Sequence, residues 1–512
     1  MKIHKGMEVL ELAKHSGFIG CWNQLVKDCP WATVFQQKEF VLTWYELFSD
    51  QTPFMITDWN GDSMTGLFSL IEKDGQLSYP GNNLAEYQVW ISTPESNTSF
   101  IKEALELIQK EYTLSLKYIP SGTPLDWVSS NGQLKNSIFL KEYPQPVMQC
   151  DEEHLEKELR KKNKKEKINR LKRQGELSFE RVISTNDFNT ILPNLVEQNE
   201  FRKGAIYGKL AFLEDPRRVD FLSRVFEKKL LHASILKLDN KIIASNVGFI
   251  TSETVHLQGL NTHSPFYAKY SPGILHFLML GIHLKKENYR YFDLTPGGAD
   301  GYKSNLATSY YTAHEMQMDS VYATKKNKVK DALKRKAKTL IGKHSKKASV
   351  LSNLFSTPSM GIGSINPGGT NTEIYLNIKG HQFSVNADKS SLVKAIPPIT
   401  YKKNDIADLL NFPLSTKRTD FLSDAMYRIE NGQVFYAITG GDQLFATLWY
   451  IPTGTKDPEG NNRAHNHLEF SYLAPNLENP QSILNGIIKD QGLSRDLVSK
   501  LELVHFKSSL LE

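Results

Sequence analysis

The residues best suited to chemistry lie in one short stretch near the middle of the chain. Asp293 follows Tyr291-Phe292, and Tyr302 and Lys303 follow a glycine-rich run. An acid, a phenol and an amine in one loop can accept a proton, donate a proton and hold an anionic group. His256, which alternates with apolar residues, is a further candidate base. The stretch therefore predicts a catalytic site at the end of a short strand.

A second stretch opens an apolar helical segment just upstream. Ser271 can cap the helix, Pro272 suits its first position, and Gly273 lets a ligand approach the backbone. The first N–H groups, of Gly273, Ile274 and Leu275, are then expected to point outward with the positive end of the helix dipole, which suits a phosphate or pyrophosphate. An ordinary capped helix is the alternative. The predicted donor-binding residues are Tyr270, Ser271, Gly273, Ile274 and Leu275.

Together the two stretches have the layout of an acyl-donor site. Acyl transfer from a thioester needs a hydrogen-bond donor for the oxyanion, a base for the acceptor and a proton for the departing thiolate. We assign these roles to an exposed N–H within 254–260, to Asp293 or His256, and to Tyr302, with Lys303 holding a phosphate or carboxylate. The alternatives are structural: Asp293 braces the following loop, Tyr302 is a buried aromatic, Lys303 is a solvated charge and His256 is a satisfied structural histidine.

Three regions share the order of elements that must position these residues. Each begins with an aromatic-rich amphipathic helix, and the second and third helices share Asp-Phe-Leu-Ser at 220–223 and 420–423. Each continues into a hairpin and a further strand, and then into a helix and a final strand. This order predicts duplicated domains, each with a mixed α/β sheet. The hairpin turns are Asn60-Gly61-Asp62, Asp239-Asn240 and Gly440-Gly441-Asp442; the helices cover about 97–111, 272–287 and 479–490; the final strands cover 113–119, 289–294 and 500–507.

The unit from about 151 to 320 resembles the acetyltransferase domain of the cellulose-biosynthesis (CelD) type. This is a branch of the GNAT superfamily related to the FemAB peptidoglycan aminoacyltransferases. The resemblance implies acyl transfer, usually from an acyl-CoA, in bacterial exopolysaccharide or envelope assembly. Thr295-Pro296-Gly297-Gly298 replaces the family's usual Arg-Gly, which indicates a distinct acceptor preference. The matching pieces, in order, are a charged helix at 159–175, a strand at 177–180, a hairpin at 235–244, the Tyr-Ser-Pro-Gly turn, and Phe292-Asp293 followed by Gly301-Tyr302-Lys303.

We therefore predict an α/β chain of tandem GNAT-like acyltransferase domains in three copies. Only the middle copy combines a phosphate-suited helix start with ionisable residues after its last strand, so the other copies receive structural or acceptor-shaping roles. The predicted parts are an N-terminal GNAT-like domain at 1–150, the catalytic domain at 151–322, a basic helix and Gly/Ser/Pro linker at 323–370, and a C-terminal GNAT-like domain at 371–512 that opens with a hairpin at 372–385.

Composition narrows the class of protein. The chain has 512 residues, 40% of them hydrophobic, which indicates a folded protein of about three domains. The three cysteines, Cys21, Cys29 and Cys150, are odd in number, which favours a reducing compartment. They have no metal-ligand spacing, so no metal cofactor is expected. The N-terminus does not resemble a signal peptide, and no apolar run approaches a membrane span. We expect a cytoplasmic protein.

The net charge of +6 is concentrated in two segments. Segment 155–174 alternates Glu with Lys and Arg, and predicts a surface helix with one modest packing face. In FemAB relatives a charged helical insertion contacts transfer RNA. Segment 323–347 has 11 Lys and Arg against one acid, and predicts a basic amphipathic helix that contacts an anionic inner-membrane surface, a simple solvated helix being the alternative. Other nucleic-acid binding is not expected, because neither segment interleaves aromatic residues.

The leading hypothesis is an N- or O-acyltransferase that uses an acyl-CoA, acetyl-CoA first of all, to modify a sugar, amino sugar or related precursor. Two alternatives remain. One is a FemAB-type aminoacyltransferase whose donor is aminoacyl-tRNA. The other is a non-catalytic scaffold of a polysaccharide assembly complex.

Overall fold

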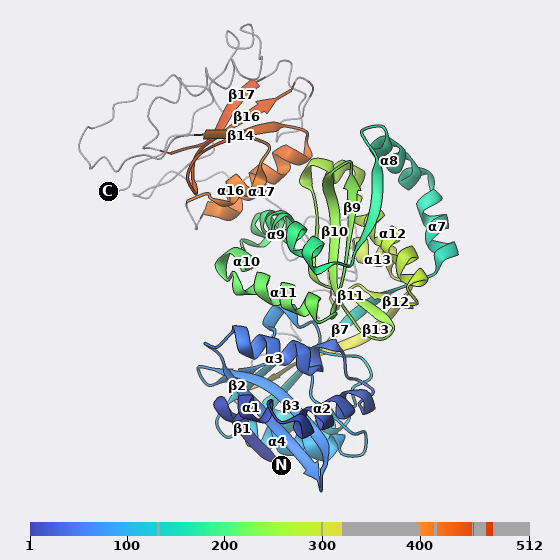
Figure 1. Cartoon of the computed structure of the whole chain (residues 1–512), viewed down its shortest axis with the longest axis vertical. Coiled ribbons are helices and arrows are strands. Elements are labelled where there is room, and N and C mark those ends of the chain that lie inside the picture. The colour runs from blue at the N-terminus through green and yellow to red at the C-terminus, as the bar shows by residue number, and fades with distance from the viewer. Residues whose placement is uncertain are drawn as a thin grey trace, which may run out of the picture.

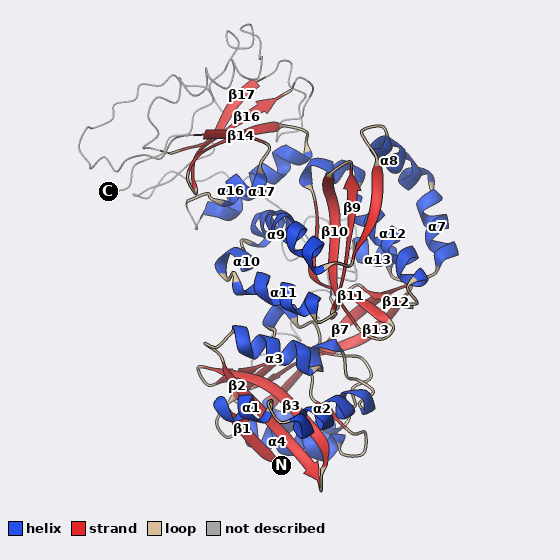
Figure 2. Cartoon of the chain, in the orientation of Figure 1, coloured by secondary structure: helices blue, strands red, loops and turns tan. Residues whose placement is uncertain are grey.

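The computed structural model describes residues 1–130, 134–297, 301–319, 400–413, 417–452, 454 and 467–474. Helices and strands alternate in three parts, shown in blue, green to yellow, and orange in Figure 1, with the helices packed against sheets (Figure 2). The predicted α/β class with a mixed sheet is confirmed. The basic segment 323–347, the hairpin at 372–385, the helix at 479–490 and the strand at 500–507 lie outside the described residues.

The first half is a mixed sheet with helices before and after its central hairpin. Its elements are β1 (Lys2–Lys5), α1 (Met7–Leu12), α2 (Ser16–Asp28), η1 (Val34–Gln36), α3 (Lys38–Leu47), β2 (Thr52–Asn60), β3 (Ser63–Lys73), β4 (Gln76–Ser78), η2 (Asn82–Leu84), β5 (Ile91–Ser92), α4 (Asn97–Ile108), β6 (Thr113–Ile119), α5 (Trp127–Ser130), α6 (Leu134–Ser137) and β7 (Ile138–Gln149).

The second half repeats that order after two charged helices. Its elements are α7 (Glu152–Arg160), α8 (Lys162–Lys172), β8 (Leu177–Val182), α9 (Thr185–Tyr207), α10 (Ala211–Glu214), α11 (Arg217–Glu227), β9 (Leu231–Leu238), β10 (Lys241–Ile250), β11 (Thr254–His263), η3 (Pro265–Tyr270), α12 (Pro272–Lys286), β12 (Tyr291–Asp293), α13 (Tyr302–Leu306) and β13 (Ser309–Met318).

The third part is described from its first strand to the strand after its hairpin. Its elements are β14 (Thr400–Lys403), α16 (Ile406–Leu410), α17 (Arg418–Glu430), β15 (Val434–Gly440), β16 (Gln443–Ile451) and β17 (His467–Leu473), with the strands in the order β14-β15-β16-β17.

The three predicted hairpins are confirmed. Asn60 pairs with Ser63, Leu238 with Lys241, and Gly440 with Gln443. Each turn places a residue at positive φ, Gly61 at 59°, Asp239 at 51° and Gly441 at 60°, which is the conformation that tight two-residue turns require.

The first and second halves form one continuous sheet in the order β1-β2-β3-β4-β6-β13-β7-β12-β11-β10-β9-β8. The two central strands are exchanged: β7, from the end of the first half, pairs with β12, and β13, from the end of the second half, pairs with β6. β7 and β13 also pair with each other, from Ser309 opposite Val147 to Met318 opposite Ile138. The sheet therefore runs across the predicted domain boundary at residue 150.

The halves also share a core. Phe40 of α3 meets Phe221 of α11 edge to face, with ring centroids 5.2 Å apart, and Phe35 lies 5.1 Å from Phe249 of β10. Helix α9 packs on the third part through a second cluster that includes Phe201. A side chain at Gly204 would clash with Leu422 of α17, so glycine permits this close approach.

The predicted charged helix at 159–175 is two helices. The chain breaks at Lys161, whose ψ of 139° is not helical, so α7 and α8 meet at an angle. The modest packing face is confirmed, because Leu155 and Leu171 are buried while most of their neighbours are exposed. Among the described residues, no helix is long and apolar enough to cross a membrane.

Candidate functional site

The site is built where two parallel strands of the second half separate. β11 pairs with β12 from Thr254 opposite Tyr291 to His256 opposite Asp293. β11 then continues to His263, whereas the chain after β12 turns toward β7, where the Leu294 N–H donates to the Pro146 carbonyl at 3.0 Å. The strands thus separate directly after His256 and Asp293, and the backbone of 257–263 extends beyond the last pair.

A β-bulge lies at the same place on β11. Gly248 of β10 pairs with Gly259 and Ile250 pairs with Val255, so residues 256–258 oppose Phe249 alone. A bulge leaves backbone groups outside the ladder and redirects the strand. This stretch lies within 254–260, where the sequence predicts the N–H that would meet an oxyanion.

Asp293 is a buried centre of hydrogen bonds, with an exposed fraction of 1%. Its Oδ2 accepts from the Tyr87 hydroxyl at 2.5 Å and from Gln145 Nε2 at 2.9 Å, and its Oδ1 accepts from the Thr295 N–H at 2.8 Å. Burial alone would raise the pKa of this carboxyl, but the contacts of His256, Tyr87 and Thr295 outweigh it and hold the pKa below its usual value. Asp293 is therefore ionised and a weak proton acceptor. Its predicted alternative role, bracing the following loop, is confirmed by the bond to Thr295.

His256 lies beside Asp293 on the face that meets the first half. Its Nδ1 is 3.3 Å from Asp293 Oδ2, a close electrostatic contact that lacks the alignment of a hydrogen bond. Both ring nitrogens are buried without a hydrogen-bond partner. The ring centroid lies 5.8 Å from that of Phe35 and 5.6 Å from that of Tyr87. The structure thus brings together the two candidate bases that the sequence predicts.

Lys303 is bonded to the loop that follows Asp293. Its Nζ donates to the Thr295 carbonyl at 3.0 Å, to Thr295 Oγ1 at 2.8 Å and to the Gly297 carbonyl at 3.1 Å. An ammonium group has three N–H donors, so Lys303 is committed to this loop. Thr295 has a φ of 70°, an unfavourable conformation for a β-branched residue, and Asp293 and Lys303 hold it from two sides.

Tyr302 packs away from this pair. It is half-buried against the apolar cluster around α12, with its ring centroid 6.1 Å from that of Phe277. Burial raises the pKa of its hydroxyl, as does the nearby Tyr207, while Arg202 lowers it. The structure therefore places Tyr302 with α12 and α9 rather than against Asp293.

Two residues that sequence reasoning missed come from the first half. Glu86 and Tyr87 are both buried, and Glu86 Oε2 has no hydrogen-bond partner. Burial raises the pKa of Glu86 from 4.5 to about 7; Asp293 also raises it, and Lys117 and Lys303 oppose the shift. The signal in the sequence is an acid and an amide, Glu86 and Gln88, within the otherwise apolar run 84–91.

The helix start at Ser271 differs from the prediction. Ser271 adopts φ 53° and its side chain does not cap α12; its Oγ instead accepts from Lys167 Nζ at 2.7 Å. The N–H groups of Ile274 and Leu275 donate to the Ser271 carbonyl at 3.1 and 3.2 Å, so they are not free for a phosphate. Gly273 is the remaining donor of the three. The error arises because the N–H of the fourth helical residue already belongs to the first intrahelical bond.

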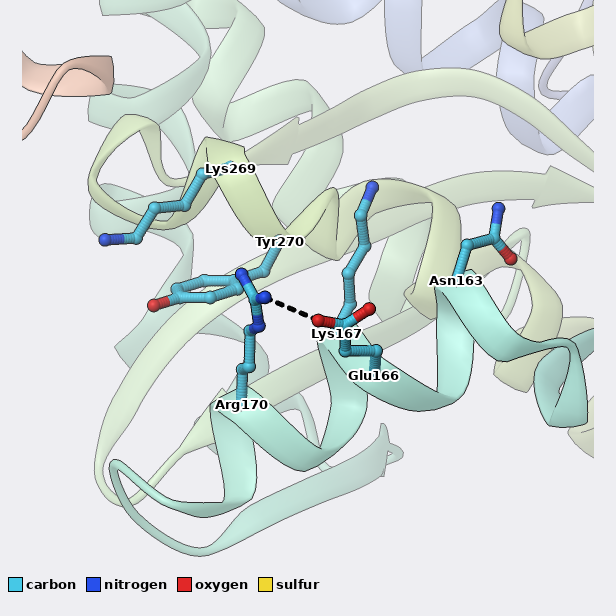
Figure 3. A pocket seen from close by; sticks show the side chains of 6 residues that line it. All are labelled: Asn163, Glu166, Lys167, Arg170, Lys269 and Tyr270. Carbon is cyan, nitrogen blue, oxygen red and sulfur yellow. Dashed lines mark hydrogen bonds and ion pairs between the residues drawn. The ribbon is translucent and has the colours of Figure 1, made fainter.

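A pocket of about 260 Å³ lies beside this helix start (Figure 3). Three cations face one acid there, and Arg170 pairs with Glu166 at 2.5 Å. Tyr270 contributes an aromatic face, with Lys269 Nζ 5.1 Å from its ring centroid. Such a wall suits phosphate groups and a planar ring. The lining residues are Asn163, Glu166, Lys167, Arg170, Lys269 and Tyr270.

Within the described residues, no group of three or more His, Cys, Asp or Glu side chains is arranged to hold a metal ion.

Comparisons with known proteins assign the reaction class. Residues 159–304 match the family model described as an acetyltransferase (GNAT) domain, and they span α8, the split strands and Lys303. The chain is thus an acyltransferase with a GNAT domain in its middle. No curated protein matches the sequence.

Several solved structures resemble a part of the chain. FemX shares 9% identity at a TM-score of 0.40, covering 62% of this chain and 97% of its own. L-PGS from Bacillus licheniformis shares 10% identity at a TM-score of 0.38, covering 60% of this chain and 93% of its own. A tandem GNAT protein from the clavulanic acid biosynthesis pathway shares 12% identity at 0.34, covering 62% and 99%. At these scores the likenesses carry no argument about substrate.

Proposed function

We propose that the chain transfers an acyl group from an acyl-CoA, with acetyl-CoA as the first donor, to an amine or hydroxyl of a sugar, amino sugar or related envelope precursor. The supporting observation is the separation of β11 and β12 directly after His256 and Asp293. Two strands that diverge in this way leave backbone groups on β11 for an extended donor arm to pair with. The match to the GNAT domain model over the same residues supports this choice of donor.

The donor's phosphates would lie at the other end of β11. Residues 257–263 span about 23 Å at about 3.3 Å per residue, which separates the site of chemistry from the start of α12. The N–H of Gly273 and the ammonium of Lys167 meet there, and the pocket of Figure 3 adjoins them. His263 faces Gly273, and burial, aided by Arg202, lowers its pKa to about 4, so it is uncharged at neutral pH.

The reacting thioester would lie at the bulge. An N–H of residues 256–258 would donate to the carbonyl oxygen as negative charge develops on it. His256 and Asp293 would orient the groups around that carbon. Since Tyr302 lies on the α12 side, its proposed role as proton donor to sulfur requires the thiolate to leave toward that face.

Donor binding tests this proposal. We expect acetyl-CoA to raise the melting temperature of the full chain, and Lys167→Gln to weaken its affinity about tenfold, because a charge-assisted bond to phosphate is lost. Lys172→Gln, an exposed lysine at the end of the same helix, is the matched control and should bind as the wild type does. If the two variants bind acetyl-CoA with equal affinity, the donor's phosphates do not bind at the start of α12.

A second donor class is favoured by one observation. Helix α8 carries six Lys and Arg against one Glu, and two of these basic residues, Lys167 and Arg170, line the pocket. That charge also suits an aminoacyl-tRNA. If charged transfer RNA raises the melting temperature and no acyl-CoA does, aminoacyl-tRNA is the donor. If neither donor raises the melting temperature, a non-catalytic scaffold is favoured.

The place of the reaction is also part of the proposal. Peripheral contact with an anionic inner-membrane surface through segment 323–347 would bring the site to envelope precursors. Failure of the full chain to co-sediment with anionic vesicles at low salt would contradict the proposed membrane contact.

A further inference from the structure

One segment of the first half reaches the site of the second. Residues 84–92, which we call the plug segment, are buried throughout. The segment is anchored on β6: the Gln88 N–H donates to the Tyr118 carbonyl at 2.7 Å, and Gln88 Oε1 accepts from the Lys117 N–H at 2.7 Å. Its Tyr87 hydroxyl then bonds Asp293. The two residues that follow Glu86 thus bond the plug segment to β6 and to Asp293.

Glu86 is the member of this segment without a complete set of partners. Its Oε2 is buried and unbonded. A buried carboxylate oxygen without a donor is costly, and such groups mark places where a ligand supplies the missing hydrogen. The ionisable groups that face it are Lys117 and Tyr118 of β6, Asp293 of β12, Lys303 of α13 and its neighbour Tyr87.

We propose that Glu86 is the catalytic base, which accepts the proton of the acceptor as the acyl group is transferred. This inference rests on the proposed function. As the bond from the acceptor nitrogen or oxygen to the acyl carbon forms, the proton passes to Glu86 Oε2 and the carbon–sulfur bond breaks. Tyr302 gives its proton to the thiolate, so the thiol leaves neutral, and the proton held by Glu86 returns to Tyr302 through water, which restores both groups.

The geometry favours Glu86 over Asp293, one of the two bases predicted from the sequence. Asp293 already accepts three hydrogen bonds, and its pKa lies below the usual value. Glu86 retains a buried oxygen without a hydrogen-bond partner, and its pKa of about 7 is close to the pH at which a general base works best. The first half would thus supply the base for a donor bound by the second.

The test compares two acceptors with acetyl-CoA as donor and the full chain as enzyme. Both acceptors lose an N–H proton when they are acylated, but the nitrogen of hydroxylamine is much less basic than that of glucosamine, an amino-sugar probe, so its proton leaves more readily without a base. With rates expressed per unprotonated acceptor, we expect Glu86→Gln to lower kcat with glucosamine by about 10²- to 10⁴-fold and to abolish the rise of the rate near pH 7. The loss with hydroxylamine should be less than about tenfold.

Glu315→Gln is the matched control. Glu315 lies on the exchanged strand β13, accepts from the Tyr143 hydroxyl at 2.8 Å and has no role in the proposed step. It should keep the wild-type pH profile with both acceptors. Equal losses with both acceptors in Glu86→Gln, or a retained rise near pH 7, would overturn the role of Glu86. A wild type that binds no acetyl-CoA would instead overturn the proposed function.

Discussion

The two halves of the sheet share one arrangement of strands, but the space between the separating strands is occupied differently in each. In the first half β4 pairs in parallel with β6 from Gln76 opposite Thr113 to Ser78 opposite Ser115, and in the second half β11 pairs in the same way with β12. In both, the strands then separate and a helix follows, α4 in one and α12 in the other. The first half fills its separation with its own plug segment, bonded to β6 through Gln88.

The starts of α4 and α12 also differ, because the protein's own side chains fill the first and a pocket adjoins the second. At α4, Asn97 is buried and its Oδ1 accepts from Trp90 Nε1 at 2.7 Å, so the protein's own side chains close that end. At α12, Lys167 and the pocket beside Tyr270 lie at the corresponding place. The segment that fills the separation in the first half thus also carries Glu86 and Tyr87 to Asp293 in the second half.

The contact between the halves at Asp293 should give the largest effect. Asp293→Ala leaves the Tyr87 hydroxyl, Gln145 and the Thr295 N–H without their acceptor, and we expect unfolding to become easier by about 3–5 kcal/mol. Urea denaturation measures the change. Asp62→Ala, at an exposed hairpin turn, should change stability by about 0.5 kcal/mol or less. A loss below about 1 kcal/mol in Asp293→Ala would mean that the halves are joined elsewhere.

The burial of Glu86 predicts a pH dependence of stability. The folded chain keeps the Glu86 proton up to about pH 7, whereas the unfolded chain releases it near 4.5. Its contribution is therefore complete below pH 4.5 and is lost as the pH rises through 7, on the order of 3 kcal/mol in total. Glu86→Gln should remove this loss. Thermal unfolding of the two proteins from pH 4 to 8 checks it, and parallel curves would show that Glu86 is solvated.

The smallest effect on stability is expected at the start of α4, and it tests whether this helix start differs from that of α12. Asn97→Ala deprives Trp90 Nε1 of its acceptor and should cost about 1–3 kcal/mol of stability, with no change in acetyl-CoA affinity. Asn97→Asp keeps the oxygen that accepts this bond and is the control. A weaker affinity for the donor in Asn97→Ala, measured by calorimetry, would show that the first half also binds it.

The sequence predicted the features that depend on residues close together along the chain. The turn at Asp239-Asn240, the helix that begins at Pro272 and the face occupied by His256 follow from local spacing and period. Asp293 was found for the same reason, because it ends a short strand after that helix. The break at Lys161 was missed because charged residues of good helix propensity continue through it.

The partners of Asp293 could not be found in this way. Tyr87 lies 206 positions away and Gln145 lies 148 positions away, so no local pattern links them to the loop. The bonds of Lys303 could not be predicted for a related reason: a charged residue after a glycine-rich turn resembles a ligand-binding group, and here it donates to the carbonyls of a strained Thr295 and of Gly297. Buried polar residues in an apolar run, as at Glu86, are the pattern that deserved more weight.

The exchanged strands have a consequence for how the chain is made. β6 has its outer edge covered only by β13, which ends at Met318, so a ribosome must translate about 200 more residues after β6 before the first half can close its sheet. During that interval an unpaired strand edge is exposed, and β7 waits likewise for β12. Nascent chains stopped before residue 309 should therefore depend on chaperones, and the strand pairing that joins the two halves is complete only when both have been synthesised.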